Sequence, residues 1–436
     1  MNIVTPSTLP GFMELMPQDQ ILFNKMMDTI RKNYERFGFL PLDTPIIEKS
    51  EVLKAKGAGE TEQQIYKVVK GHTDMSMRFD LTVPLAKYVA QYYSQLSFPF
   101  RRYQIGKVYR GERNQRGRFR EFYQCDIDII GDGSIGLIND AEIPSVIYST
   151  FKDLGFDSFK IVINNRKILN GLFNSLNIED TVGVLRTVDK IEKIGRDAVE
   201  AELTELGCSP ESIVELFKFL EIVGTNDEIL AKLKTLDYKD PVFIEGRDEL
   251  ETVVKYIRDF GVDEANFQID LTIARGLDYY TGTVYETMIE GYESMGSVCS
   301  GGRYDDLAEF YINRKLPGVG ISIGLTRLFY QLKEANLINF DTKDYTKAIV
   351  IPMDEAHIEA SIELVAKIRN AGFNALVYTE NAKLGKKFKY ADSINAEYAI
   401  VIGDNEIANA RYSLRNMETG EQNEFSAEEI VDYFKR

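Results

Sequence analysis

The sequence predicts an α+β core that is interrupted by a helical insertion and followed by a smaller α/β domain with a mixed sheet. Three patterns indicate this arrangement. Two strand-like segments flank a basic loop between residues 100 and 131, and residues 168–245 are mostly helical in pattern and strongly charged. After a polar joint near 339–344, short strands and helices alternate, which is typical of an α/β domain.

The first elements follow from apolar spacing and from the positions of proline and glycine. Pro17 suits a first helical position, apolar residues recur at helical spacing over 17–37, and Gly38 ends this helix. The next segment, LPLDTPII, is expected to be extended because its prolines disfavour a helix. Residues 74–82 alternate, which predicts an inward apolar face and an outward polar face. The polar face consists of Ser76, Arg78, Asp80 and Thr82.

A hairpin is predicted at 100–131, with its loop at Arg113 to Gly117. Eight arginines or lysines and a single acid lie between residues 101 and 120, in a chain whose formal net charge is −16. A solvated, salt-bridged surface is the alternative, but exposed faces of an acidic protein usually mix both signs. This hairpin is therefore predicted to bind anionic groups, for which arginine's planar fork is suited.

The two strands of this hairpin are each expected to have two distinct faces. Arg110 and Glu112 share a parity and are predicted to project from one face of the incoming strand. The polar face of the outgoing strand consists of Gln124, Asp126 and Asp128. Its core face consists of Tyr123, Cys125, Ile127 and Ile129.

The remaining elements follow from the same rules of spacing. In the core, helices are predicted at 84–95 and 139–154, strands at 159–164, Phe267–Ala274 and Thr283–Ile289, a tight turn or loop at Gly296–Tyr304, and a helix at Ile321–Leu332. In the last part, strands are predicted at 347–353, 374–378 and 398–403, and helices at Ala356–Ala371 and Ala382–Ile394. A hairpin turning at Thr419-Gly420 precedes a final helix, which begins with a capping box formed by Ser426 and Glu429.

Composition disfavours several classes of protein. No uninterrupted apolar run approaches the roughly 18–20 residues of a membrane span, and the first residues lack the order of a secretion signal, so no membrane partner is expected. The three cysteines are far apart and form no CxxC pair, which argues against a disulfide framework or a cysteine zinc site and fits the reducing cytosol. With only His72 and His357 present, neither near a nucleophile motif, most histidine-dependent chemistry is disfavoured.

Two further segments carry candidate site residues. In ARGLDYYTGTVYE (274–286), the tyrosines alone would fit a core, but Arg275 and Asp278 are unfavourable when buried without a partner. GVGISIGLTRL (318–328) has the spacing Gly-x-Gly-x-x-x-Gly and lacks a ribose-binding acid, so it does not fit a dinucleotide loop. Glycines on a strand packed closely against a helix that delivers Arg327 fit better. Since no GxxxxGK[ST] occurs, ATP is not expected to be held by a P-loop.

Over nearly its full length the chain resembles the histidyl-tRNA synthetases, which are class II aminoacyl-tRNA synthetases. GFLPLDTP (38–45), which ends in Pro45, is similar to their motif 1, the basic hairpin to motif 2, and GVGISIGLTRL to motif 3. These three motifs occur across class II enzymes, whereas RGLDYYTG resembles a segment peculiar to the histidine enzyme. The last part, including KLGKKFKYAD, is similar to the family's anticodon-binding domain. The resemblance implies a catalytic core on an antiparallel sheet at 1–167 and 246–338, a helical insertion domain at 168–245 and an anticodon-binding domain at 345–436.

The resemblance also implies a reaction and its partners. Histidine and ATP would form histidyl-adenylate, from which histidine passes to tRNA(His). Mg²⁺ would accompany ATP as substrate, and no tightly bound protein-ligated metal is expected. A homodimer formed through motif 1 and a cytoplasmic location are further expectations.

Individual roles follow by resemblance for the matching residues. Arg110 would hold the α-phosphate and the substrate carboxylate, and Arg275 would stabilise charge on the α-phosphate. The ATP contacts would be completed by Glu112 at the adenine, by Arg118 at the outer phosphates and by Arg327 at both the adenine and the outer phosphates. The α-ammonium of histidine would be bound by Asp80, Thr82 and Gln124. The imidazole nitrogens would be contacted by Asp128 and Tyr280, in a pocket to which Arg275 and Tyr279 also belong.

The sequence departs from the family pattern at three positions, and two other functions compete. Asp80 and Asp128 stand where many relatives carry glutamate, and Thr326 replaces the glutamate that often precedes the motif 3 arginine. The main alternative is a regulatory paralogue that senses histidine and assists ATP phosphoribosyltransferase, which usually lacks an anticodon-binding domain. A non-catalytic nucleic-acid-binding adaptor is the third class, and it gives no reason for Asp128 and Tyr280 to accompany Arg275.

Overall fold

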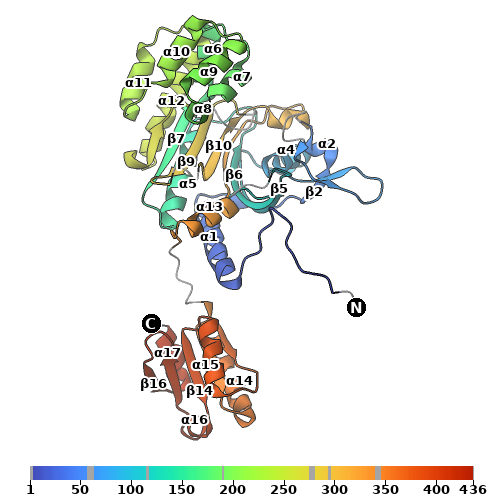
Figure 1. Ribbon diagram of the computed structural model, residues 1–436, viewed down its shortest axis with the longest axis vertical. Coiled ribbons are helices and arrows are strands. Elements are labelled where there is room, and N and C mark those ends of the chain that lie inside the picture. Colours follow the sequence, from blue (N-terminus) through green and yellow to red (C-terminus); the bar gives the residue numbers. More distant parts are fainter. Residues whose placement is uncertain are drawn as a thin grey trace. The chain divides into compact units, whose positions relative to one another are not determined.

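The computed structural model describes residues 3–55, 63–113, 117–188, 191–273, 280–292, 296–338 and 345–435 (Figure 1). The chain divides into two compact units. The first consists of residues 1–14 and 26–338, and the second of residues 15–25 and 339–436. Each unit has a sheet of its own, covered by helices.

An eight-stranded sheet forms the centre of the first unit, with the strand order β1-β5-β6-β11-β10-β9-β7-β8. The strands are β1 (Leu40–Pro41), β5 (Phe100–Tyr109), β6 (Glu121–Ile130), β7 (Phe159–Asn165), β8 (Phe267–Ile269), β9 (Thr283–Ile289), β10 (Cys299–Tyr304) and β11 (Gly318–Ile323). All neighbours from β5 to β7 are antiparallel. The two edge strands pair in parallel, β1 with β5 and β8 with β7. The predicted antiparallel core sheet is confirmed.

Helices and a small second sheet complete the core of the first unit. The helices are α1 (Pro17–Arg36), of which residues 26–36 belong to this unit, α2 (Ser50–Leu53), α4 (Thr82–Gln91), α5 (Ile138–Asp153) and α13 (Leu325–Glu334). The small sheet has the order β2-β4-β3, with β2 (Ile47–Lys49), β3 (Lys67–Val68) and β4 (Met75–Met77). α5 packs on β7 and β11, and α13 packs on β6. Cys125, Ile127 and Ile129 are completely buried, as predicted for the core face of β6.

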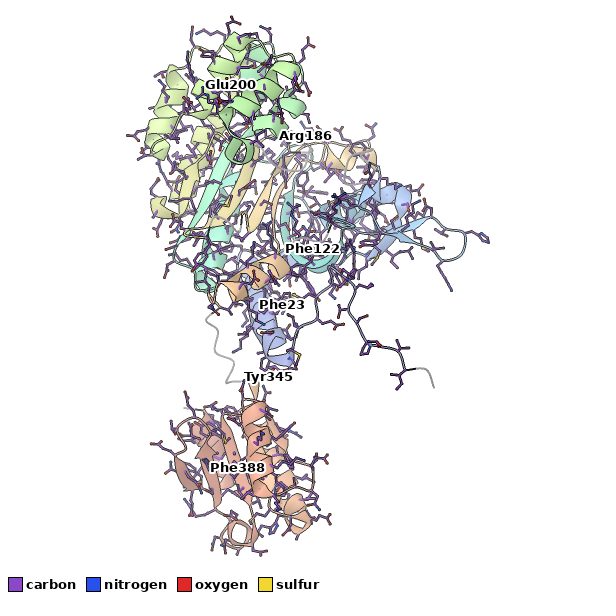
Figure 2. The ribbon with its side chains drawn as sticks, in the orientation of Figure 1. Phe23, Phe122, Arg186, Glu200, Tyr345 and Phe388 are labelled. Carbon is purple, nitrogen blue, oxygen red and sulfur yellow. The ribbon has the colours of Figure 1, made fainter. Side chains whose placement is uncertain are left out.

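The insertion is helical, as predicted. Its helices are α6 (Arg166–Ser175), α7 (Thr181–Val188), α8 (Ile191–Ile194), α9 (Arg196–Glu205), α10 (Pro210–Leu220), α11 (Asn226–Thr235) and α12 (Pro241–Asp259). Most of them gather beyond one end of β7 and β9, where Arg186 and Glu200 are labelled (Figures 1 and 2), whereas α12 also packs on α5 and β7. The side chains of Ser209, Thr225 and Asp240 cap α10, α11 and α12 by accepting backbone N–H groups. The predicted boundary at residue 245 falls inside α12, which runs without a break to Asp259. This boundary therefore stays a prediction.

Residues 74–82 do not form the alternating strand that their sequence predicts. β4 ends at Met77, and α4 begins at Thr82. Three of the four residues expected to face outward are buried, namely Ser76, Arg78 and Asp80. Arg78 is accommodated because its guanidinium donates to the backbone oxygens of Lys107, at 2.8 Å, and of Thr44. The outward polar face was therefore a wrong prediction.

Two boundaries near the motif 3 region also differ from the prediction. Residues Cys299–Tyr304, expected in a turn or loop, are strand β10, and the helix expected from Ile321 begins at Leu325 because Gly318–Ile323 is β11. A Cβ atom at Gly301 would collide with the backbone oxygen of Gly320. These glycines therefore allow β10 and β11 to lie close together, rather than forming a turn.

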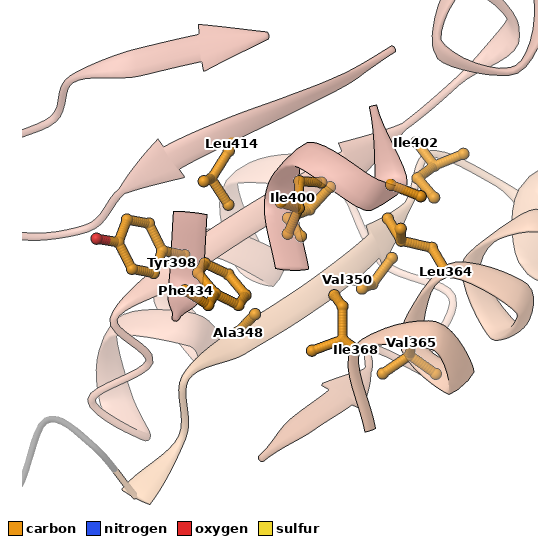
Figure 3. Packing of buried hydrophobic residues seen from close by; sticks show 12 residues of the cluster. Ala348, Val350, Leu364, Val365, Ile368, Tyr398, Ile400, Ile402, Leu414 and Phe434 are labelled. Atoms are coloured by element: carbon orange, nitrogen blue, oxygen red, sulfur yellow. The ribbon is translucent and has the colours of Figure 1, made fainter. Parts of the chain in front are cut away.

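The second unit is a five-stranded mixed sheet with helices, as predicted. Its strands are β12 (Ala348–Pro352), β13 (Ala375–Val377), β14 (Tyr398–Ile402), β15 (Tyr412–Asn416) and β16 (Gln422–Phe425), in the order β13-β12-β14-β15-β16. The helices are α14 (Ile358–Asn370), α15 (Leu384–Ser393), α16 (Asp404–Asn409) and α17 (Ala427–Phe434). Figure 3 shows Val350 and Ile400 of the sheet packed against Leu364, Ile368 and Phe434 of the helices. The capping box of Ser426 and Glu429 is present at the start of α17.

Candidate active site

The first unit contains a cavity of about 480 Å³ lined by residues of β6, β9, β10, β11 and the first turn of α13. Nine of the eleven site residues predicted from the sequence line this cavity. They are Asp80, Thr82, Arg110, Glu112, Arg118, Gln124, Asp128, Tyr280 and Arg327. The other two, Arg275 and Tyr279, lie outside the described residues. Phe122, labelled in Figure 2, is also part of the lining.

Arg110 is held in a fixed orientation just after the end of β5. Its backbone N–H still pairs with the backbone oxygen of Arg120 at 2.9 Å, which continues the hairpin by one residue. Its Nε donates to the backbone oxygen of Phe79 at 3.0 Å, and its guanidinium carbon lies 5.2 Å from the centroid of the Phe122 ring. Among the described residues, its Nη atoms have no hydrogen-bond partner, so they remain available to an anionic ligand.

A second cationic region is formed by Arg118 and Arg327. Arg118 is paired only loosely, with its Nη1 3.4 Å from Glu112 Oε2. Burial lowers the pKa of Arg327 from its ordinary value, and the positive charge of Arg118 lowers it further. Two guanidinium groups that repel each other in one cavity are stabilised when an anion binds between them.

A buried carboxylate, that of Asp80, also lines the cavity. Asp80 Oδ1 accepts the backbone N–H of Val83 at 3.1 Å, at the start of α4. Asp80 Oδ2 is buried and has no partner among the described residues. Burial raises the pKa of Asp80 to about 6, although the charges of Arg110 and Arg102 oppose this shift. An unpaired oxygen in this setting is suited to accept a hydrogen bond from an ammonium group.

Asp128 is bound on both of its carboxylate oxygens. Oδ1 accepts a hydrogen bond from the Tyr304 hydroxyl at 2.8 Å, and Oδ2 lies 2.6 Å from Arg102 Nη2. Burial raises the pKa of Asp128, whereas Arg102 and Tyr304 lower it. Gly320 lies opposite Asp128 in the sheet, and a Cβ atom there would collide with the carboxylate. The glycine on β11 is thus required by the position of the acid.

Gln124 and Tyr280 are two further members of the predicted set. Gln124 Nε2 donates to Ser322 Oγ at 2.8 Å, while its Oε1 is buried without a partner among the described residues. The ring of Tyr280 lies over Gly302, where a Cβ atom would be 3.0 Å from Tyr280 Cδ1. Both side chains are therefore positioned by residues of the β10–β11 pair.

Sequence reasoning missed several residues at this site. Asp126, Tyr285, Glu286, Ser300, Tyr304 and Ser322 also line the cavity. Asp126 was placed on the polar face of β6 but was given no role, and burial raises its pKa to about 7. Thr326 accepts the backbone N–H of Tyr123 on its hydroxyl at 2.8 Å, so it ties α13 to β6. For most of these residues, the only indication in the sequence was that they are close to residues predicted to belong to the site.

Three further features concern metal ligands, cysteines and membrane-spanning helices. Among the residues that the structure describes, no three His, Cys, Asp or Glu side chains are grouped so that they could hold a metal ion. Cys125, Cys208 and Cys299 are buried and free. No helix in the described ranges is both long and apolar enough to cross a membrane.

Comparisons with known proteins agree on one family. Residues 11–328 match the family model of histidyl-tRNA synthetase, and residues 347–436 match that of an anticodon binding domain. The chain is 61% identical over 435 residues to a histidine–tRNA ligase of Clostridium tetani, covering 100% of this chain and 99% of that protein. It is 48% identical to a histidine–tRNA ligase of Finegoldia magna, covering 99% of this chain and 100% of the other. Among solved structures, the histidyl-tRNA synthetase of Nostoc sp. PCC 7120 matches with a TM-score of 0.91 and 41% identity, covering 100% of this chain and 99% of that one.

Proposed function

The chain belongs to the histidyl-tRNA synthetase family, and from this premise we propose how its residues carry out the reaction of a class II aminoacyl-tRNA synthetase. The protein ligates L-histidine to tRNA in an ATP-dependent reaction. We propose that it does so through a histidyl-adenylate intermediate formed in the cavity of the first unit, with tRNA(His) as the acceptor.

One observation supports this proposal most strongly. The same cavity of about 480 Å³ is lined by three guanidinium groups, from Arg110, Arg118 and Arg327, and by Asp80, whose Oδ2 has no partner within the described part of the chain. An amino acid next to a nucleoside triphosphate is a ligand of matching polarity, with a cationic ammonium at one end and phosphates at the other. Neither a purely cationic nor a purely anionic ligand would use both sets of groups.

Adenylate formation would proceed by in-line attack of the histidine carboxylate on the α-phosphorus, with pyrophosphate as the leaving group. Arg110 would bind one oxygen of each reactant and so hold them at reacting distance. Arg118 and Arg327 would bind the outer phosphates, and Glu112 and Arg327 would contact the adenine. Arg275 would stabilise the charge that develops on the α-phosphate. Mg²⁺ would arrive bound to ATP as part of the substrate.

The second step would transfer histidine to the terminal ribose of the tRNA. A ribose hydroxyl would attack the carbonyl carbon of the adenylate, and AMP would leave. Asp80, Thr82 and Gln124 would hold the α-ammonium throughout both steps. This binding fixes the carbonyl carbon within the cavity.

Selection of histidine would depend on Asp128 and Tyr280, one at each imidazole nitrogen. A pocket built to hydrogen-bond both nitrogens leaves its own buried groups unpaired when another amino acid enters. Such a mismatch can discriminate by about 10⁴–10⁵-fold, so a separate editing site is not needed.

The regulatory and adaptor alternatives are not favoured. The second unit matches an anticodon binding domain over residues 347–436, a domain that the regulatory paralogue usually lacks. The decisive test is ATP–pyrophosphate exchange measured with each amino acid in turn. We expect exchange with histidine alone. A folded chain that gives no exchange with histidine would refute the enzymatic proposal.

The second unit is proposed to bind tRNA through a basic side of α15. Lys383, Lys386 and Lys389 are spaced three residues apart and are exposed, whereas Lys387 is buried and its Nζ donates to the backbone oxygen of Pro352 at 2.7 Å. Reversing the three exposed charges to glutamate should raise the KM for tRNA on the order of tenfold or more and weaken its salt dependence, because phosphate contacts are lost.

The measurement compares tRNA charging with ATP–pyrophosphate exchange, which should stay unchanged. Reversal of three other basic residues in the same unit, Lys367, Arg369 and Lys435, is the matched control. Equal loss of charging in both triple variants would argue against a specific tRNA contact at α15.

We also propose a homodimer formed through the segment that resembles motif 1 (38–45) together with the two isoleucines that follow it. Leu40, Ile46 and Ile47 are 63%, 40% and 46% exposed. They lie on or next to β1 and β2, which are edge strands of their sheets. Apolar side chains on exposed edges favour association. The mass in solution should be twice the 49.7 kDa of the chain, and Leu40→Asp/Ile47→Asp should return it to the single-chain value. A single-chain mass for the unmodified protein would contradict the dimer.

A further inference from the structure

Arg102 lies behind the proposed histidine pocket and has no part in its lining. It faces Asp128 directly in the pairing of β5 with β6, and its side chain is completely buried. Nη2 lies 2.6 Å from Asp128 Oδ2 and 3.3 Å from the backbone oxygen of Leu81. A fully buried arginine is costly to retain unless its charge has a function or a strong partner.

The environment of Asp128 gives this arginine a specific task. Tyr304 occupies one carboxylate oxygen from β10, and Arg102 occupies the other from β5. The carboxylate is therefore held between two strands in one orientation. We propose that Arg102 is a positioning residue for histidine recognition, which orients the Asp128 carboxylate and keeps it ionised so that it can accept the imidazole N–H. This inference rests on the proposed role of Asp128.

Other titratable groups face the same arginine and must be separated in any test. They are Asp126 and Asp128 on β6, Asp80 before α4, Tyr304 on β10 and Tyr34 on α1. The charge of Arg102 lowers the pKa of Asp80, Asp126 and Asp128, each of which is raised by burial. Loss of Arg102 would therefore favour the protonated form of all three acids. Only the effect that passes through Asp128 should change the recognition of imidazole.

A double-variant cycle isolates this effect. Arg102→Met, Asp128→Asn and the combined variant are compared with the unmodified full chain, and the KM values for histidine and ATP are measured by ATP–pyrophosphate exchange from pH 6 to 9. These KM values do not depend on the fraction of chains that fold. Arg101→Met is the matched control, because Arg101 is the neighbouring residue and pairs with Glu142 at 2.8 Å, away from the cavity lining.

Arg102→Met should raise the KM for histidine about tenfold or more at pH 7 and leave that for ATP within about twofold, since a charged contact behind the pocket is lost. The increase should shrink as the pH rises, because a higher pH restores the Asp128 carboxylate. In the Asp128→Asn background, the Arg102 substitution should add only the smaller increase that it causes through Asp80, where Arg102 is a lesser influence on the pKa than at Asp128. Arg102→Lys should recover most of the affinity for histidine.

Other results would overturn the inference. Three results would assign Arg102 a structural role only. They are equal increases in both KM values, an Arg102 effect that is undiminished in the Asp128→Asn background, and an increase in the KM for histidine that is independent of pH. If Asp128→Asn leaves the KM for histidine unchanged, the proposed role of Asp128 is wrong. If Asp128→Asn raises this KM but Arg102→Met leaves it unchanged, only the inference about Arg102 is wrong. If Arg102→Met does not fold, the combined variant and Arg102→Lys still test the role of Arg102, since neither of them leaves one charge of the pair isolated.

Discussion

Replacing Arg110 with alanine is expected to lower the rate of histidine-dependent ATP–pyrophosphate exchange by roughly 10³-fold or more. The reason is the fixed position of its guanidinium. Nε is bound to the backbone oxygen of Phe79 at 3.0 Å, and the group lies 5.2 Å from the centre of the Phe122 ring. The two Nη atoms are thus oriented before ATP binds, so little reorganisation accompanies the development of charge on the α-phosphate.

Lys107→Ala is the matched control for this experiment. Lys107 is on the same strand and its Nζ lies 2.8 Å from Glu121 Oε1, but it does not line the cavity. A partly exposed ion pair of this kind contributes only about 0–1 kcal/mol. The control should keep exchange within about twofold of the unmodified enzyme. An exchange rate for Arg110→Ala within tenfold of the unmodified enzyme would contradict the role given to Arg110.

Replacing Asp80 with asparagine is expected to raise the KM for histidine on the order of 10²-fold or more, because leaving a buried charge without its partner costs about 3–5 kcal/mol. Asparagine keeps the shape and the oxygen that accepts the Val83 N–H at 3.1 Å, so α4 should still be capped. The KM for ATP should change little. Asp74→Asn serves as the control, since Asp74 lies on the same segment but is 68% exposed on its side chain.

The pH dependence of this effect has a defined sign. Burial raises the pKa of Asp80 to about 6, so its carboxylate is charged above that pH and becomes neutral below it. The ratio of the KM for histidine in Asp80→Asn to that in the unmodified enzyme should therefore be largest above pH 6 and approach one below it. Protonation of histidine itself affects both enzymes and cancels in this ratio. A ratio that stays constant from pH 5 to 8 would show that Asp80 does not act through its charge.

Much of the fold could be predicted from local patterns in the sequence. An apolar period that matches the structure is present in several elements of the first part of the chain. They are the two hairpin strands, the helix Pro17–Arg36 and the strand Thr283–Ile289. The same holds for the second unit, where short strands of Ala, Ile and Val alternate with amphipathic helices. In the helices, the side chains that pack in the core are those that the sequence period places on one face. β12 and β14 are apolar throughout and pack in a core on each face of their sheet.

Prediction failed where tertiary contacts override local preference. Arg78 is buried because backbone oxygens of Thr44 and Lys107 meet its guanidinium, and those residues are distant in the sequence. Gly301 and Gly302 suggest a turn by composition, yet they are in a strand because β10 lies tightly against β11. A pattern of neighbouring residues contains no information about such contacts.

The candidate site shows the same division. Arg110, Gln124 and Asp128 could be proposed from the charge and parity of one hairpin, and resemblance to a family supplied their roles. Arg102 and Tyr304 could not, because their importance follows from contacts with Asp128 across three strands. One of these partners, Arg102, is on the same hairpin but was indistinguishable from the other basic residues of its run.

The central claim is that histidine and ATP meet in the cavity of the first unit. A crystal structure of the full chain with a non-hydrolysable sulfamoyl analogue of histidyl-adenylate tests it most directly. The account predicts the imidazole between Asp128 and Tyr280, the ammonium on Asp80 Oδ2 and the sulfamoyl group on Arg110. An analogue bound outside this cavity, or one whose imidazole points away from Asp128, would contradict it.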